Sequence, residues 1–148
     1  MIRTAMVADL PRLRQVYRRS SLSNQGDRVN LLAHGDLLEF SGEGIGAERT
    51  RVALDAHSSI IGFSTFLVGG DTMELEDLFV DPPWMRQGVG KALVADLVAI
   101  ARAHSLAQLE VTANPHAMAF YGSLGFVAGP DVETRFYSAP RMHLTVRP

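Results

Sequence analysis

The chain has 148 residues, of which 47% are hydrophobic and 20% charged, and this balance predicts one folded domain over residues 1–148. It contains no cysteine, which excludes disulfides, cysteine-ligated zinc and a thiol nucleophile. The formal net charge of -2 argues against non-specific binding to nucleic acid, which requires a basic surface.

Neither the N-terminus nor the most apolar stretch favours export or membrane insertion. Arg3 and Asp9 interrupt the region where a signal peptide needs an apolar core. The most apolar stretch, residues 92–101, contains Asp96 and is too short to cross a bilayer. We therefore expect a soluble, cytoplasmic protein with no membrane partner.

Charge is distributed unevenly along the chain. Residues 1–20 hold five arginines against Asp9, whereas residues 27–81 hold eleven acidic residues against three arginines. An acidic stretch usually forms a solvated face, but it also suits a cationic small-molecule partner.

The first third of the chain predicts a short strand, two helices and a loop. Residues 2–5 suit a strand, and apolar residues recur at helical spacing from Asp9 to Tyr17. A second helix is predicted over residues 29–40. Residues 41–46 contain three glycines and predict a flexible loop.

Strands are predicted in quick succession after this loop, over residues 51–54, 60–68 and 73–80. Gly69-Gly70-Asp71 predicts a hairpin between the last two of them. The remaining predicted elements are a long helix over 88–103, a strand over 108–112, a short helix over 115–124 and a closing strand over 141–146. Strands that first pair as hairpins and then alternate with helices predict an α/β or α+β protein with a mixed sheet.

The segment from Leu75 to Leu93 leaves a strand and opens a helix through a glycine-bearing loop. Pro82-Pro83 ends the strand, while Gly88 and Gly90 allow the backbone to approach a ligand closely. Free amides at the start of a helix bind anions, phosphates above all. The alternative is structural: Gly88 permits a tight turn and Gly90 permits close helix packing.

Two common phosphate-binding motifs do not match this loop. A Walker loop needs glycine at position 85 and serine or threonine at position 92, where the chain has Met85 and Ala92. A Rossmann fingerprint needs a third small residue where the chain has Leu93.

Gly88-Val89-Gly90, after a strand ending Leu78-Phe79-Val80, resembles the acetyl-CoA loop of the GNAT N-acetyltransferase superfamily. Asp9-Leu-Pro-Arg-Leu13 is similar to the start of that family's first helix. The segment from Asn114 to Phe126, with Phe-Tyr ahead of Gly-Phe, resembles a later part of the family. One departure is Met85, which stands where the family usually has arginine or glutamine.

The resemblance implies a GNAT-like fold, in which a central mixed, mostly antiparallel sheet contains a splayed parallel strand pair and about four helices flank it. It also implies acetyl-CoA as cosubstrate and no metal, with acetyl-CoA lying between the strands that end at Val80 and Thr112. The pyrophosphate would lie on the loop amides and the pantetheine would bind along the strand edge like an added strand. Asn114 would contact the pantetheine or the acceptor, although capping the helix at Pro115 is an alternative. The implied cofactor-binding residues are Leu78, Phe79, Val80, Arg86, Gln87, Gly88, Val89, Gly90, Lys91 and Asn114.

Acyl transfer to an amine needs a base for the amine proton, an oxyanion donor and an acid for the leaving thiolate. Glu76 is the expected base, since the Leu75–Val80 run resembles that of diamine and polyamine acetyltransferases, in which the glutamate assists deprotonation. Asp77 faces the opposite side of a regular strand, so only one of the two carboxylates can serve well as the base, and a bulge that reorders them would leave that role to Asp77. The Val80 N–H is the expected oxyanion donor. Tyr121 is the expected acid.

Both catalytic candidates have a structural alternative. Glu76 could be a solvent-facing strand residue, and Tyr121 could be a half-buried core aromatic beside Phe120 and Phe126. The five histidines show no metal-ligand spacing.

We therefore expect an acetyl-CoA-dependent N-acetyltransferase that transfers directly in a ternary complex, forms a homodimer, and has no nucleic-acid partner. The acidic stretch, with Asp36 and Glu39, suggests a cationic acceptor such as a polyamine, an aminoglycoside or a basic peptide end. Two alternatives stay open. One is an acyl-CoA-binding sensor without turnover, and the other is an acyltransferase with a different acyl group or acceptor.

Overall fold

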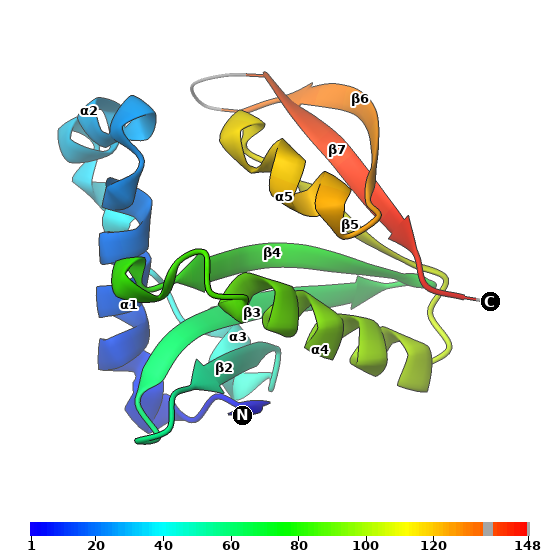
Figure 1. Cartoon of the computed structure of the whole chain (residues 1–148), viewed down its shortest axis with the longest axis horizontal. Helices are drawn as coiled ribbons and strands as arrows, with labels where there is room; N and C mark the ends of the chain where they lie inside the picture. Colours follow the sequence, from blue (N-terminus) through cyan, green and yellow to red (C-terminus); the bar gives the residue numbers. More distant parts are fainter. Residues whose placement is uncertain (135–137, 148) are drawn as a thin grey trace. The chain divides into compact units, whose positions relative to one another are not determined.

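The computed structural model describes residues 1–134 and 138–147. These residues form seven strands and five α-helices (Figure 1). In chain order the elements are β1 (Ile2–Thr4), α1 (Leu10–Ser23), α2 (Gln25–Ala33), α3 (Glu43–Gly46), β2 (Thr50–Leu54), β3 (Ile60–Gly69), β4 (Thr72–Val80), α4 (Val89–Ala103), β5 (Gln108–Thr112), α5 (Met118–Ser123), β6 (Val127–Glu133) and β7 (Ser138–Thr145).

The chain divides into two compact units, and each unit combines two segments of sequence. The first unit comprises Met1–Thr65 and Asp77–Val94, and the second comprises Phe66–Glu76 and Ala95–Pro148. Three elements, β3, β4 and α4, therefore begin in one unit and end in the other.

In the first unit, antiparallel strands form the sheet. β1 pairs with β2 from Ile2 opposite Ala53, and β2 pairs with β3 from Thr50 opposite Thr65. The end of β4 is joined to β3 by the N–H of Asp81, which donates to the carbonyl of Ile61 at 2.8 Å.

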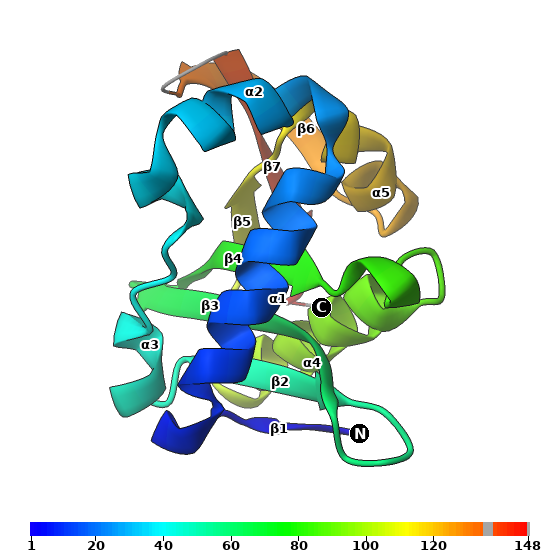
Figure 2. The same cartoon turned by 90° about the vertical axis from the view of Figure 1, so that its left-hand side faces the viewer.

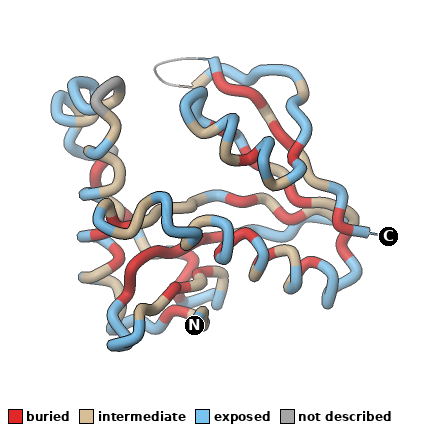
Figure 3. The backbone as a smooth tube through the Cα atoms, in the orientation of Figure 1, coloured by how far each residue is buried: buried red, intermediate tan, exposed pale blue. Residues whose placement is uncertain are grey.

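Both faces of this sheet are covered by apolar side chains. Helix α1 lies across β2 and β3 (Figure 2), and its Leu13 and Val16 are buried in a cluster with Val52 and Phe63. On the other face, Leu93 of α4 packs in a second cluster with Ala53 and Ile61. Residues 60–65 of β3 are all buried as a result (Figure 3).

The second unit contains a parallel pair of strands. β4 pairs with β5 in parallel from Thr72 opposite Gln108 to Leu75 opposite Val111, while β5 with β7 and β6 with β7 are antiparallel. The strand order is β1-β2-β3-β4-β5-β7-β6. The predicted mixed, mostly antiparallel sheet with one parallel pair is confirmed. The second unit buries Met73, Leu75, Leu97, Ala101, Leu109, Val111, Phe126 and Met142.

Three local predictions were wrong. The helix predicted over residues 29–40 is α2 over Gln25–Ala33 followed by a separate 3₁₀ turn at Gly35–Leu38. The side chain of Asn24 caps α2 by accepting a hydrogen bond from the N–H of Asp27, so the helix starts earlier than its apolar pattern. The loop predicted over residues 41–46 contains α3, and strand β6 was not predicted.

Among the described residues, none of the helices is both long enough and apolar enough to cross a membrane.

Candidate functional site

The loop between β4 and α4 has an unusual backbone. Arg86 and Gly88 have φ of 63° and 84°, in the left-handed region, which side chains other than glycine rarely enter. Both residues are exposed. Because a strained residue such as Arg86 persists only where its surroundings fix it, the loop is a candidate for ligand binding.

Helix α4 presents free donors to this loop. The first hydrogen bond of the helix runs from the N–H of Ala92 to the carbonyl of Gly88, at 3.0 Å. The N–H groups of Val89, Gly90 and Lys91 therefore have no acceptor within the helix. Helix-terminal amides and the positive end of the helix dipole favour an anion at this position, and the exposed Lys91 adds a positive charge.

Gly62 of β3 lets the start of α4 approach the sheet. A Cβ atom at this position would lie 3.0 Å from the carbonyl oxygen of Phe79 and 3.0 Å from Cγ1 of Val89. Leu93 would be 3.4 Å away. The absence of a side chain at Gly62 therefore permits the close approach of the first turn of α4 to this part of the sheet.

The end of β4 leaves backbone groups on one edge. The last pair of the β4–β5 ladder is Leu75 with Val111, and residues 76–80 continue beyond it. Because the N–H of Asp81 donates to β3, and successive N–H groups of a strand point to opposite edges, the N–H of Val80 points away from β3. The resemblance found in the sequence implies that the pantetheine and the oxyanion donor lie at this edge.

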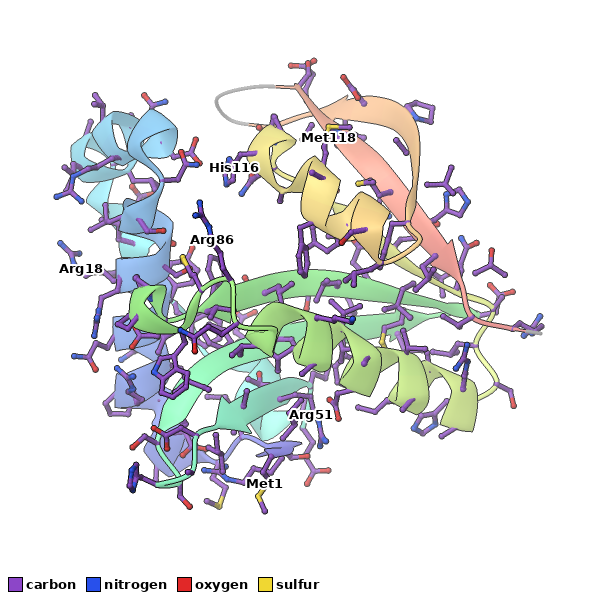
Figure 4. The ribbon with its side chains drawn as sticks, in the orientation of Figure 1. Met1, Arg18, Arg51, Arg86, His116 and Met118 are labelled. Carbon is purple, nitrogen blue, oxygen red and sulfur yellow. The ribbon has the colours of Figure 1, made fainter. Side chains whose placement is uncertain are left out.

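The side chains of the loop point in different directions. Arg86 projects freely from the loop (Figure 4), and Gln87 donates from Nε2 to the carbonyl of Pro83 at 3.0 Å. Met85 turns the other way, and its sulfur lies 4.0 Å from Oγ of Ser23 at the end of α1. Met85 thus packs on α1. Arg86, the next residue, is a charged side chain that the loop exposes in place of the family's usual arginine or glutamine at position 85.

The two adjacent carboxylates of β4 have different surroundings. Glu76 is exposed, whereas Asp77 is half-buried and accepts a hydrogen bond from Oγ1 of Thr65 on β3. The pKa of Tyr17, on α1, is raised by burial and also by the negative charge of Asp77. Asp77 therefore lies on the α1 face of the sheet.

Tyr121 lies on α5 with only 6% of its surface exposed. Its ring makes edge contacts with Phe120 and Phe126, at centroid distances of 5.0 Å and 5.3 Å. Burial raises the pKa of the phenol strongly, so this side chain stays protonated over the whole physiological range. It is more deeply buried than the half-buried position considered from the sequence.

Asn114 is exposed and occupies the position before the 3₁₀ turn Pro115–Ala117. Its carbonyl accepts from the N–H of Ala117 at 2.8 Å, but its side chain makes no capping hydrogen bond. The side chain is thus not used as a helix cap.

Asp36 and Glu39 line a surface pocket in the first unit together with Arg14 and Arg18. Leu38 and Phe40, both buried, form apolar parts of the same pocket. Arg18 projects outward from α1 on the side away from Arg86 (Figure 4). The two acidic residues expected to face a cationic acceptor therefore share their surroundings with two cationic side chains.

Among residues 1–134 and 138–147, no group of three or more histidine, aspartate or glutamate side chains could hold a metal ion.

The family comparison decides the classification. The Acetyltransferase (GNAT) family matches residues 12–126 of the chain. The chain belongs to the GNAT family. This stretch contains β4, the loop, the start of α4 and the segment up to Phe126, so the GNAT-typical loop identified in the sequence is part of the match.

Relatives and solved structures agree with this. An uncharacterized N-acetyltransferase of Pyropia yezoensis is 27% identical over 88 residues, which cover 59% of this chain and 51% of that protein. The glucosamine 6-phosphate N-acetyltransferase of Trypanosoma brucei brucei is 36% identical over 64 residues, 43% of this chain and 44% of that protein. The matches thus span about half the length of these relatives.

Two solved structures share the GNAT fold over nearly the whole chain. The PaiA N-acetyltransferase of Thermoplasma acidophilum, in complex with coenzyme A, superposes with a TM-score of 0.79 at 20% identity and covers 98% of both chains. The ribosomal-protein-S18-alanine N-acetyltransferase of Escherichia coli gives a TM-score of 0.76 at 23% identity, covering 100% of this chain and 94% of that chain.

Several residues around the candidate site were not identified from the sequence. Asp81 is buried and lies between Arg12, at 3.0 Å from Oδ2, and Arg19, at 3.3 Å from Oδ1. The Arg12 contact is a hydrogen bond, whereas Oδ1 has no partner with hydrogen-bond geometry. The acidic residue directly after β4 and the arginines of α1 were visible in the sequence, but their pairing depends on the tertiary fold. Gly62, Thr65 and Tyr17 gave no sequence signal that points to the site.

Proposed function

We propose that the protein is an N-acetyltransferase that moves the acetyl group of acetyl-CoA to an amine. The observation that carries this proposal is the start of α4, where free amides follow two left-handed residues next to the open edge of β4. An anion-binding helix start beside the part of β4 that extends beyond its pairing with β5, residues 78–80, suits a molecule with a diphosphate and an amide-containing arm.

The residues of the loop fit coenzyme A in their chemistry. The amides of residues 86–91 would hold the diphosphate, with the charges of Arg86 and Lys91 nearby. The backbone of Leu78, Phe79 and Val80 would pair with the pantetheine, and Asn114 would add a side-chain contact. The PaiA structure in complex with coenzyme A supports this assignment because it has the same fold.

The reaction needs no covalent enzyme intermediate. The amine nitrogen attacks the thioester carbon, the carbonyl oxygen becomes an oxyanion, and the carbon–sulfur bond then breaks. The amine loses a proton to the base, and the thiolate of coenzyme A takes one from the acid. The Val80 N–H would stabilise the oxyanion.

Glu76 and Tyr121 are our candidates for the base and the acid. Glu76 is exposed on β4, so a water molecule or the amine can reach it. Tyr121 stays protonated because burial raises the pKa of its phenol, which keeps the proton available but makes its donation to a thiolate uphill. We therefore place the contribution of Tyr121 at the low end for an acid–base group.

The acceptor is an amine, and we propose a cationic one. The names of the relatives include an amino-sugar phosphate and a ribosomal-protein alanine as acceptors, so the GNAT fold alone does not select between small molecules and peptide ends. The acidic composition of residues 27–81 favours a positively charged acceptor. The alternative is an acyl-CoA sensor without turnover. Met85, where the family usually has arginine or glutamine, packs on α1 and gives the loop no polar side chain at that position, so this alternative must be tested.

Steady-state thiol release from acetyl-CoA tests the catalytic roles, with spermidine, kanamycin and an arginine-rich peptide as acceptors. Glu76→Gln should lower kcat about 10² to 10⁴-fold, since a positioned base contributes that much. The deficit should shrink as the pH rises toward the pKa of the amine, because more of the amine is then already neutral and only the proton lost after attack remains to be removed. Tyr121→Phe keeps the ring contacts and should lower kcat on the order of 10²-fold.

Asp71→Asn is the matched control, because this carboxylate is exposed on the turn between β3 and β4. It should leave turnover unchanged. Binding of acetyl-CoA without thiol release above the amine-free background, for all three acceptors, would identify a sensor and reject the enzyme.

A further inference from the structure

Asp81 is a buried carboxylate at the point where β4 ends and the loop before α4 begins. Only 3% of its surface is exposed. Its N–H donates to the carbonyl of Ile61 on β3, and its carbonyl accepts from the N–H of Trp84, each at 2.8 Å. The backbone of Asp81 therefore joins the loop to the sheet and starts the 3₁₀ turn Pro82–Trp84.

Helix α1 holds the side chain of Asp81 from two positions on one of its faces. Arg12 donates from Nη2 to Oδ2 at 3.0 Å, and Nε of Arg19 lies 3.3 Å from Oδ1. Arg12 is itself fixed, because its Nε donates to the carbonyl of Ile60 and its Nη1 to the side chain of Gln15. Residues seven apart lie on the same face of a helix, so both arginines reach one carboxylate. Since a buried carboxylate needs such partners, its position relative to α1 is well defined.

Met85 makes a second attachment to the same helix. Its sulfur lies 4.0 Å from Oγ of Ser23, and α1 also contacts the turn Pro82–Trp84 (Figure 2). The loop is thus held on α1 at both ends of the segment 81–85. Arg86 follows directly, with a φ of 63° that costs free energy for an arginine and persists only where the surroundings fix it. The two attachments supply those surroundings.

We propose that Asp81 and Met85 are positioning residues for the diphosphate of acetyl-CoA. They hold the loop on α1, so that Arg86 and Gly88 keep their left-handed conformation and the free amides at the start of α4 are in place before the ligand binds. A site that is ordered in advance loses less conformational entropy on binding and therefore binds more tightly. This inference rests on the proposed function. It also gives a task to Met85, which stands where the family usually has arginine or glutamine.

The charge of Asp81 and its attachment to α1 have opposite effects on an anionic ligand. Asp81→Asn removes one negative charge and leaves Arg12 and Arg19 without their counter-charge, so charge alone would strengthen the binding of a diphosphate. Loss of the attachment would weaken this binding, because the ligand must then order the loop. The direction of the change in affinity therefore separates a positioning role from an electrostatic one.

Calorimetric titration with coenzyme A, well below the temperature of unfolding, measures this affinity in the wild type and in two variants. Asp81→Asn should raise the dissociation constant about tenfold and Met85→Ala about two- to fivefold, since ordering one or two further residues on binding costs this much. In the ligand-free protein, the NMR order parameters of the amides of residues 86–91 should fall in both variants. Met85 is partly exposed, so Met85→Ala stays folded and tests the segment independently of the ion pairs.

Val146→Ala is the control for a loss of stability alone. This side chain is buried in the second unit, where the N–H of Val146 donates to the carbonyl of Ala107 just before β5. The variant should lower the Tm and leave both the dissociation constant and the order parameters of residues 86–91 unchanged.

Three results would each overturn the inference: an equal or lower dissociation constant in Asp81→Asn, an unchanged one in Met85→Ala, or an equal loss of affinity in Val146→Ala. Unchanged order parameters of residues 86–91 in Asp81→Asn would also overturn it, because the loop would then not depend on the attachment. Failure of the wild type to bind coenzyme A would instead contradict the proposed function.

Discussion

At the scale of the residue, Gly62 shows how one missing side chain can shape a candidate binding site. Its Cα faces the carbonyl of Phe79 and the side chains of Val89 and Leu93, at the point where α4 begins. The carbonyl belongs to the backbone and cannot rotate away. Gly62 on β3 therefore allows the free amides of α4 to lie close to the edge of β4.

Gly62→Ala should lower the free energy of unfolding by about 1–2 kcal/mol, because overpacking at a closely packed site costs this much. It should also weaken acetyl-CoA binding several-fold, since the start of α4 must shift. Urea denaturation and calorimetric titration measure the two effects. Gly69→Ala is the control: it lies on the same strand with nothing within 4 Å of a Cβ, and it should be close to neutral. Equal stability of the two variants would contradict this packing account.

At the scale of the element, α1 is joined to the start of the loop by charge. Arg12 donates from Nε to the carbonyl of Ile60 and from Nη2 to Asp81, and Arg19 lies 3.3 Å from the other oxygen of Asp81. Arg14 and Arg18, on another side of the same helix, line the pocket with Asp36 and Glu39. The four arginines of α1 thus lie on two sides of the helix, with Arg12 and Arg19 at Asp81 and with Arg14 and Arg18 at the pocket.

Asp81→Asn should lower the free energy of unfolding by about 2 kcal/mol, because it leaves two arginines without their buried counter-charge. The partial exposure of both arginines keeps this value below that of a fully buried pair. Asp71→Asn, in an exposed turn, should change stability by less than about 0.5 kcal/mol. Coincident denaturation curves for Asp81→Asn and the wild type would show that the ion pair contributes nothing.

The elements that the sequence predicted well are those with strong local signals. The β3–β4 hairpin forms around Gly70, whose φ of 61° matches its role in the tight turn, and α4 follows Gly88 with an apolar face. Strand β6 was missed because its residues carry Gly129 and Pro130 and most of them are exposed. The prediction of one helix over residues 29–40 was wrong because the chain leaves the helix at His34 and Gly35. Apolar spacing alone does not reveal this break.

At the scale of the whole molecule, the loop residues could be predicted because glycine spacing after a strand is a local pattern. Gly88 and the open edge of β4 have the backbone geometry that this pattern implies. Asp77, Thr65 and Tyr17 come from three elements, so only the tertiary fold brings them together. Tyr121 was proposed from its sequence context, whereas its depth of burial depends on the packing around α5.

The central claim is that the start of α4 binds the diphosphate of acetyl-CoA. Thermal unfolding with increasing acetyl-CoA tests this most directly, in the wild type, Gly88→Asp and Gly70→Asp. Gly88 and Gly70 both have positive φ and open space around a Cβ, so the two variants add the same side chain under similar strain.

A ligand that binds the folded state at a hundred times its Kd stabilises that state by about 2.7 kcal/mol. We predict that acetyl-CoA raises the Tm of the wild type and of Gly70→Asp, and that the shift disappears in Gly88→Asp because a carboxylate then faces the diphosphate. An unchanged Tm in a cooperatively folded wild type, or an equal shift in Gly88→Asp, would contradict the claim.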